Sequence, residues 1–118
     1  MDLGDKQDAI NDYSEAISIN PTHVKAFYNR ANIKDELGDK SGAIDDYSKA
    51  ISIDPTYAEA YNNRGNIKFA LGDKSGAIAD YTKATSIDPT YAEAHRNRVA
   101  AIDFLRKLGP KGNAPLRP

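Results

Sequence analysis

The stretch LGDKSGAIDDYSKAISIDPTYAEAYNNR, residues 37–64, returns 34 positions later as LGDKSGAIADYTKATSIDPTYAEAHRNR, residues 71–98. The two copies are identical at 23 of 28 aligned positions, and a weaker copy begins at Leu3. A fixed period of this length is typical of a stack of similar supersecondary units. The period therefore predicts a repeat architecture before any single residue is considered.

Each period contains two helical patterns, which we expect at about residues 58–71 and 74–87. A Gly-Asp pair separates the two patterns, and Asp73 is suited to cap the second helix because its carboxylate can accept backbone N–H groups. Thr56 and Glu59 have the T-x-x-E spacing of a capping box. We therefore expect this threonine to cap the first helix.

Small and large side chains alternate where the two helices would meet. The small residues of one period are Gly65, Ala77 and Ala84, and the large residue Tyr81 lies between the last two. In length, in helix-turn-helix layout and in the placement of small residues, this pattern resembles the tetratricopeptide repeat (TPR). The resemblance covers about residues 3–105 and implies an all-α, right-handed α-solenoid.

The register of the repeat predicts six helices. Each repeat of the family has a helix A followed by a helix B, and here the order would be B, A-B, A-B, A. We assign residues 1–108 to the TPR solenoid and 109–118 to a flexible basic tail. The solenoid divides into a half repeat 1–22, full repeats 23–56 and 57–90, and a half repeat 91–108. Neither end has an obvious polar cap, and the apolar residues between Val99 and Leu108 would need a cover.

The charge distribution bears on partners. The net charge of −1 divides into −5 over residues 1–105 and +4 over residues 106–118. RNA binding is an alternative by analogy with related helical-hairpin repeats, but an acidic body argues against contact with phosphates. The sequence has no apolar run of membrane-spanning length and no signal-peptide pattern. We therefore expect a cytoplasmic protein with no nucleic-acid or membrane partner.

We expect no catalytic residues, no metal site and no cofactor. The chain contains no cysteine, and its two histidines lack the spacing of metal ligands. His23 and His95 each replace an aromatic residue of the other copies, so both are interpreted as packing positions. The GDKSG segments lack the G-x-x-x-x-G-K-[ST] spacing of a phosphate-binding loop.

The polar residues of helix A carry the functional hypothesis. In the family, helix A lines the concave surface, and peptide contacts commonly come from its positions 2, 5, 6 and 9, which share one face of a helix. Asparagine occupies position 6 in every copy and position 9 in two, and a carboxamide offers both a donor and an acceptor, as a peptide bond does. Duplication of the repeat alone could also explain this recurrence. The candidates are Asn29, Asn32, Asn63, Asn66 and Asn97, with Tyr28, Asn62 and Arg96 at position 5.

We hypothesise that these asparagines form a ladder that holds an extended peptide or partner segment. The chain would then be a non-enzymatic protein–protein interaction scaffold. Replacing Asn63 with alanine is expected to weaken partner binding and to leave the thermal melt nearly unchanged.

The best-known site of the family, the carboxylate clamp of chaperone-binding domains, is not predicted here. By the resemblance, the clamp would need cations at the positions of Tyr28, Glu93 and Asn97. Only Asn32 and Asn63 match it. Binding of chaperone C-termini is therefore not expected.

Two positions of helix A depart from the family pattern. Position 7, usually leucine, is arginine, and position 11, usually aromatic, is lysine at residues 34 and 68. A charge on the packing surface needs a partner, and position 23 of helix B is always aspartate. We predict ion pairs between Arg30 and Asp46 and between Arg64 and Asp80.

The same pairing rule leaves one residue without a partner at each end of the stack. Asp12 lies on a helix B with no helix A before it, and Arg98 lies on a helix A with no helix B after it. If Arg98 of one molecule met Asp12 of another, the chain would associate head to tail. A self-assembling structural module is therefore the alternative function.

Overall fold

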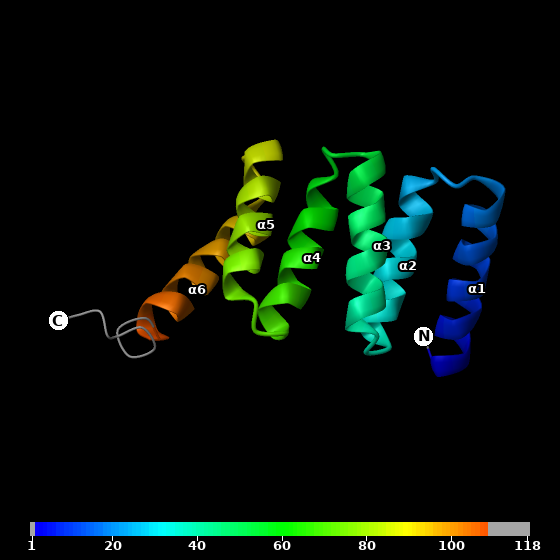
Figure 1. Cartoon of the computed structure of the whole chain (residues 1–118), viewed down its shortest axis with the longest axis horizontal. Coiled ribbons are helices and arrows are strands. Elements are labelled where there is room, and N and C mark those ends of the chain that lie inside the picture. Colours follow the sequence, from blue (N-terminus) through cyan, green and yellow to red (C-terminus); the bar gives the residue numbers. More distant parts are fainter. Residues whose placement is uncertain (1, 109–118) are drawn as a thin grey trace.

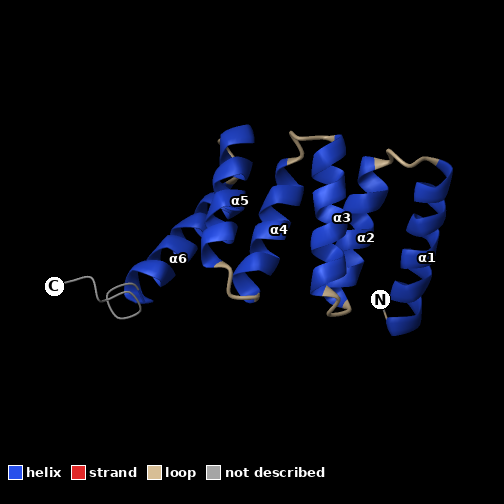
Figure 2. Ribbon diagram, in the orientation of Figure 1, coloured by secondary structure: helices blue, strands red, loops and turns tan. Residues whose placement is uncertain are grey.

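Six α-helices within the described residues follow one another along the molecule in chain order, with α2 partly behind α3 and α6 crossing behind α5 (Figure 1). The computed structural model describes residues 2–108, and within them Figure 2 shows only helices and their connecting loops. The helices are α1 (Leu3–Ile19), α2 (Val24–Glu36), α3 (Lys40–Ile53), α4 (Ala58–Ala70), α5 (Lys74–Ile87) and α6 (Ala92–Leu108). The predicted all-α solenoid of six helices is confirmed. The predicted tail, 109–118, lies outside the described residues.

The second helix of each pair begins with an aspartate cap, as predicted. Asp39 Oδ1 accepts the backbone N–H of Gly42, and Asp73 Oδ1 accepts that of Gly76, both at 2.9 Å. The capping carboxylate also explains the glycine, which is costly inside a helix. A Cβ on Gly42 would lie 2.2 Å from Asp39 Oδ2, so a larger residue would displace the cap.

The predicted capping box at the start of α4 is wrong. Thr56 Oγ1 donates a hydrogen bond to Asp54 Oδ1 at 2.7 Å, and the Thr56 backbone N–H donates to the same oxygen. Tyr57 is the residue that precedes the helix, and it makes no side-chain cap. The threonine hydroxyl is thus a donor to the aspartate two residues earlier, and the bonds from Thr56 lower the pKa of Asp54.

Large aromatic side chains pack against very small residues where two helices meet. Tyr47 on α3 is 1% exposed and packs in one cluster with Ala31 of α2. In the next repeat the fit is closer, because a Cβ on Gly65 would lie 2.9 Å from a ring carbon of Tyr81. Residue size at this position therefore limits how closely helix A approaches helix B.

A buried aspartate on α3 accepts two cations from α2. Asp46 is 5% exposed; its Oδ2 lies 2.7 Å from Arg30 Nε and 3.0 Å from Lys34 Nζ. Arg30 Nη2 donates to Asp46 Oδ1 at 2.8 Å, which makes the pair bidentate. Arg30 Nη1 also donates to Ser14 on α1 at 3.0 Å. One guanidinium therefore joins three successive helices.

The same arrangement recurs one repeat later. Arg64 bonds both carboxylate oxygens of Asp80, at 2.9 and 2.8 Å, and reaches Ser48 on α3. Lys68 Nζ lies 3.2 Å from Asp80 Oδ2. The hydrogen bond from each arginine to its aspartate raises the pKa of Arg30 and of Arg64. Both predicted ion pairs are thus present, and the lysines at position 11 are additional partners that were not predicted.

We predict that Asp46→Ala destabilises the fold by about 3–5 kcal/mol, because it leaves Arg30 and Lys34 near the interior without their carboxylate. Asp45→Ala is the matched control, since Asp45 is the neighbouring residue and is exposed. Its cost should stay within about 0.5 kcal/mol. Urea unfolding followed by circular dichroism measures both, and equal losses in the two variants would contradict the role given to Asp46.

Candidate functional site

A row of carboxamides crosses from one helix A to the next. Asn63 Nδ2 on α4 donates to Tyr28 OH at 3.0 Å and to Asn32 Oδ1 at 3.2 Å, both on α2. The same step joins α6 to α4, where Asn97 Nδ2 donates to Asn62 Oδ1 at 3.1 Å and to Asn66 Oδ1 at 3.2 Å. Asn63 and Asn97, both at position 6, therefore each bind positions 5 and 9 of the preceding helix A.

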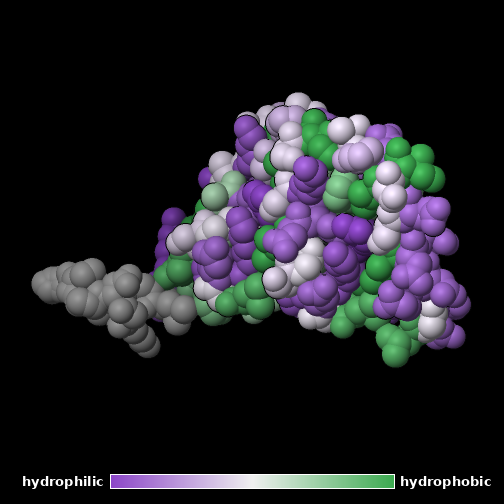
Figure 3. Space-filling model, turned by 45° about the vertical axis from the view of Figure 1, so that its right-hand side comes forward, coloured by the Kyte–Doolittle hydropathy of each residue, from purple (hydrophilic) through white to green (hydrophobic). Residues whose placement is uncertain are grey.

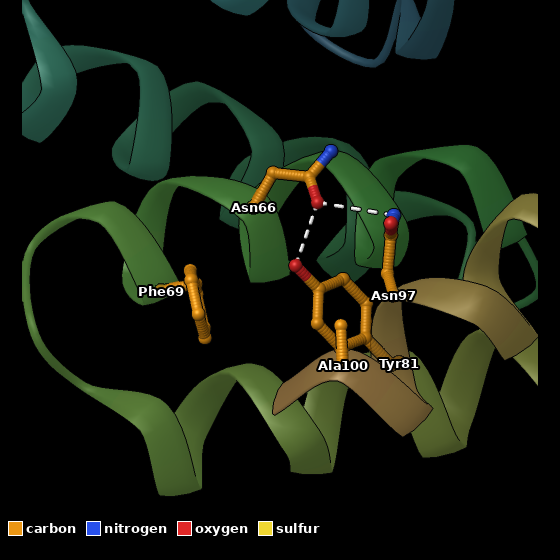
Figure 4. Close-up of a pocket in the computed structure, with 5 residues that line it drawn as sticks. All are labelled: Asn66, Phe69, Tyr81, Asn97 and Ala100. Carbon is orange, nitrogen blue, oxygen red and sulfur yellow. Dashed lines mark hydrogen bonds between the residues drawn. The ribbon is translucent and has the colours of Figure 1, made fainter. Parts of the chain in front are cut away.

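A buried tyrosine from helix B completes each step. Tyr81 OH donates to Asn66 Oδ1 at 2.6 Å (Figure 4), and Tyr47 OH donates in the same way to Asn32 Oδ1. Burial raises the pKa of Tyr81 to about 12 and also raises that of Tyr47, so both phenols remain neutral donors at neutral pH. The tyrosine fixes which way the amide points.

Two asparagines each have a side-chain NH2 group that takes no part in the internal hydrogen bonds. Oδ1 of Asn32 and Oδ1 of Asn66 each accept two hydrogen bonds, whereas neither Nδ2 bonds another described residue. Asn66 is exposed, and its nitrogen turns away from the pocket in Figure 4. The groups available to a ligand at these two positions are therefore N–H donors.

The remaining candidates differ in exposure. Asn62 is completely buried, so it supports the row from inside, and Arg96 is exposed. Tyr28 is half-buried and stacks on Tyr57, with ring centroids 4.8 Å apart. Asn29 makes no side-chain hydrogen bond to a described residue, because α2 has no earlier helix A beside it.

The expected effect of Asn63→Ala must be corrected. The Asn63 amide donates two hydrogen bonds within the molecule. Its loss leaves the half-buried acceptors on α2 without their donor, so the substitution would lower stability as well as any ligand binding. Asn63 is therefore a poor probe of binding alone.

The row ends beside a small cavity between α4, α5 and α6 (Figure 4). The cavity measures about 150 Å³ and is lined by Asn66, Phe69, Tyr81, Asn97 and Ala100. The Phe69 ring is held from behind by Lys74 Nζ, 3.9 Å from its centroid, and by an edge contact with Phe104. Polar amides and apolar carbon therefore meet at the α6 end of the row.

Both histidines have local structural contacts. His23 Nδ1 accepts the backbone N–H of Ala26 at the start of α2, and His95 Nε2 lies 2.9 Å from the carbonyl oxygen of Pro89. The described residues contain no cluster of three or more potential metal ligands. None of the six described helices has the length and hydropathy needed to cross a bilayer.

Family models match most of the chain. A model described as TPR repeat matches residues 1–38 and 32–72, and one described as tetratricopeptide repeat matches residues 58–91. A search of curated proteins returns no match.

Several solved structures are similar to this chain. The first TPR domain of Spaghetti (RPAP3), bound to the HSP90 peptide SRMEEVD, is 26% identical with a TM-score of 0.83, over 87% of this chain and 82% of that one. The Arabidopsis OM64 TPR domain is 30% identical with a TM-score of 0.78, over 83% and 81%. A MamA crystal structure, 24% identical with a TM-score of 0.75 over 96% and 68%, shows likeness of fold alone.

We predict that the native protein resists alkaline titration of its buried tyrosines. Burial raises the pKa of Tyr57, Tyr81 and Tyr91 to about 12, from an ordinary value of 10.0. Between these two pH values the unfolded chain loses protons that the folded chain retains. The stability that the protonated phenols contribute to the fold is therefore complete below pH 10 and declines as the pH rises through about 12.

Ultraviolet difference absorbance against pH measures this titration, with Tyr81→Phe as the control that removes one late phenol. Titration of every tyrosine near pH 10.0 in the native protein would contradict the prediction.

Proposed function

The chain belongs to the tetratricopeptide repeat family, and on this premise we propose that it binds an extended peptide or partner segment along α2, α4 and α6. It acts as a protein-interaction scaffold without catalytic activity of its own. We propose a cytoplasmic location and no nucleic-acid or membrane partner, since residues 1–105 carry a net charge of −5.

The observation that supports this function is the pair of unused amide donors on the asparagine row. Asn32 and Asn66 occupy the same position of successive repeats, and tyrosine and asparagine donors hold both Oδ1 atoms inward. Their Nδ2 groups can therefore donate to carbonyl oxygens of an extended main chain. Donors fixed by internal bonds bind with little loss of side-chain entropy.

The kind of peptide differs from the one bound by the Spaghetti domain. That domain was solved with a peptide that ends in acidic residues. Here Tyr28, Glu93 and Asn97 stand where a carboxylate clamp would need cations, and Glu93 is exposed. We propose that this chain recognises the main chain of its ligand and not a terminal carboxylate.

End-to-end association is the second candidate function. Arg98 Nε donates to Thr82 Oγ1 at 2.9 Å, which is equivalent to the arginine–serine contact of the inner repeats, but Arg98 makes no ion pair with an aspartate within the described residues. Asp12 is exposed on α1, and α1 lies at the opposite end of the stack from α6 (Figure 1). Arg98 and Asp12 lie at opposite ends of one chain, so contact between them would need a second copy of the chain.

We predict that Asn66→Asp weakens peptide binding about tenfold and leaves stability nearly unchanged. The carboxylate still accepts from Tyr81 and Asn97, but it replaces the outward donor with an acceptor that repels carbonyl oxygens. The probe is a peptide selected from a random display library on the wild-type chain, with affinity measured by calorimetry.

Asn11→Asp is the matched control, because it makes the same chemical change at an exposed site on α1. The proposal fails if Asn66→Asp binds the selected peptide as tightly as the wild type, or if Asn11→Asp weakens binding equally.

For the second candidate, we predict that association of the wild type increases with concentration in sedimentation velocity and is lost in Arg98→Glu. The reversed charge would repel Asp12 of the next copy. A wild type that stays monomeric at high concentration rejects the association, and an oligomer that survives Arg98→Glu rejects the proposed contact.

A further inference from the structure

Helix α1 leaves partly uncovered a face that the other B helices bury. On α3 this face consists of Ala43, Asp46, Tyr47 and Ala50, which are between 0% and 5% exposed. On α5 the equivalent residues are Ala77, Asp80, Tyr81 and Ala84, between 0% and 4% exposed. Helix α1 carries the same residue types at the same positions, and none of them is buried: Asp12 is exposed, and Ala9, Tyr13 and Ala16 are half-buried.

In the inner copies two helices cover such a face, the helix A that follows it and the helix A that precedes it, and α1 has only the helix that follows. In each copy a neighbouring helix A presents an aromatic residue, an arginine, a small residue and a lysine at i, i+3, i+4 and i+7, which form one side of a helix. The arginine and lysine bind the aspartate, the arginine lies beside the aromatic ring, and the small residue faces the tyrosine. The residues are Phe27, Arg30, Ala31 and Lys34 in α2, and Tyr61, Arg64, Gly65 and Lys68 in α4.

We infer that the face of α1 formed by Ala9, Asp12, Tyr13 and Ala16 binds an amphipathic helix of a partner chain that carries this four-residue pattern. Charge complementarity identifies the occupant. The exposed carboxylate of Asp12 is placed to accept one arginine and one lysine, as the buried carboxylates of Asp46 and Asp80 do. This site is separate from the asparagine row and does not depend on the peptide binding proposed for that row.

The appearance of the α1 end agrees with such a contact. Figure 3 turns this end toward the viewer, and hydrophobic residues there form separate patches among hydrophilic ones. A mixed surface of this kind is suited to a helix that offers both an apolar stripe and cations.

The size limit at the small position makes the site selective. A Cβ at Gly65 already lies 2.9 Å from Tyr81, so a branched residue there would be held away from the tyrosine. The chain's own α6 carries Val99 at this position and Ile102 in place of the lysine. Helix α6 of a second copy is therefore a poor occupant in this geometry, although its Arg98 fits.

A peptide with the α4 sequence, residues 57–71, tests the site against the full chain. The peptide is labelled at its end and stapled between positions 62 and 66, on the side away from the pattern, because a free helix of this length is marginal in water. Fluorescence anisotropy should give saturable binding. Arg64→Ala or Gly65→Val in the peptide should each weaken the affinity at least tenfold.

In the full chain, Asp12→Asn should weaken binding of the same peptide at least tenfold, and the loss should not add to that of the Arg64→Ala peptide. Asp8→Asn, an exposed change one turn away on α1, is the matched control and should have no effect. Asn66→Asp should also leave this binding unchanged, which separates the site from the asparagine row.

Three results would overturn the inference. The first is no binding of the stapled peptide at its solubility limit. The second is binding that Asp12→Asn leaves intact, since the peptide would then occupy the place of α4 in the stack or bind at the asparagine row. The third is equal binding of the Gly65→Val peptide, which would remove the size limit that makes α6 a poor occupant.

Discussion

The buried carboxylates of Asp46 and Asp80 are the constraint on which the stack depends. A desolvated aspartate is costly unless it is paired, and each one takes an arginine and a lysine from the helix before it. The same arginine reaches a serine on the preceding helix B. A rotation of helix A by one residue would break all of these contacts at once, so the network fixes the register of the apolar packing around it.

The functional surface is a consequence of that register. Once the helices are fixed, the asparagines of successive A helices come within hydrogen-bond distance, and tyrosines from the B helices orient them. The bonds that stabilise the stack thereby turn the Nδ2 groups of Asn32 and Asn66 outward. In the proposed function, stability and ligand recognition therefore share one row of residues, which is why Asn63→Ala cannot separate them and a donor-to-acceptor change at Asn66 can.

The 34-residue period predicted the fold and the helix boundaries, and with the resemblance to the tetratricopeptide repeat, which places position 7 on the packing surface, it also predicted the arginine–aspartate pairs. It could not predict which partner a side chain binds when several are within reach. Thr56 turns to Asp54 instead of capping α4, and Lys34 joins Asp46 although its unusual position was noted. The sequence pattern assigns the asparagines to a ligand, whereas in the structure most of their polar atoms bind one another. Spacing along one helix does not give the distance to the neighbouring helix.

Repetition also has a consequence at the two ends of the stack. An interface used between every pair of repeats leaves one half of itself at each end, and simple duplication would keep the two halves complementary. The two ends differ in how closely they match the inner repeats. Helix α1 has all four residue types of the helix-binding face, whereas α6 has Val99 in place of the small residue and Ile102 in place of the lysine. The two changes remove the close fit and one of the two cations, but Arg98 and its contact with Thr82 remain. The α6 end is thus poorly matched to the α1 end, and the α1 end retains the chemistry to accept a better-matched helix.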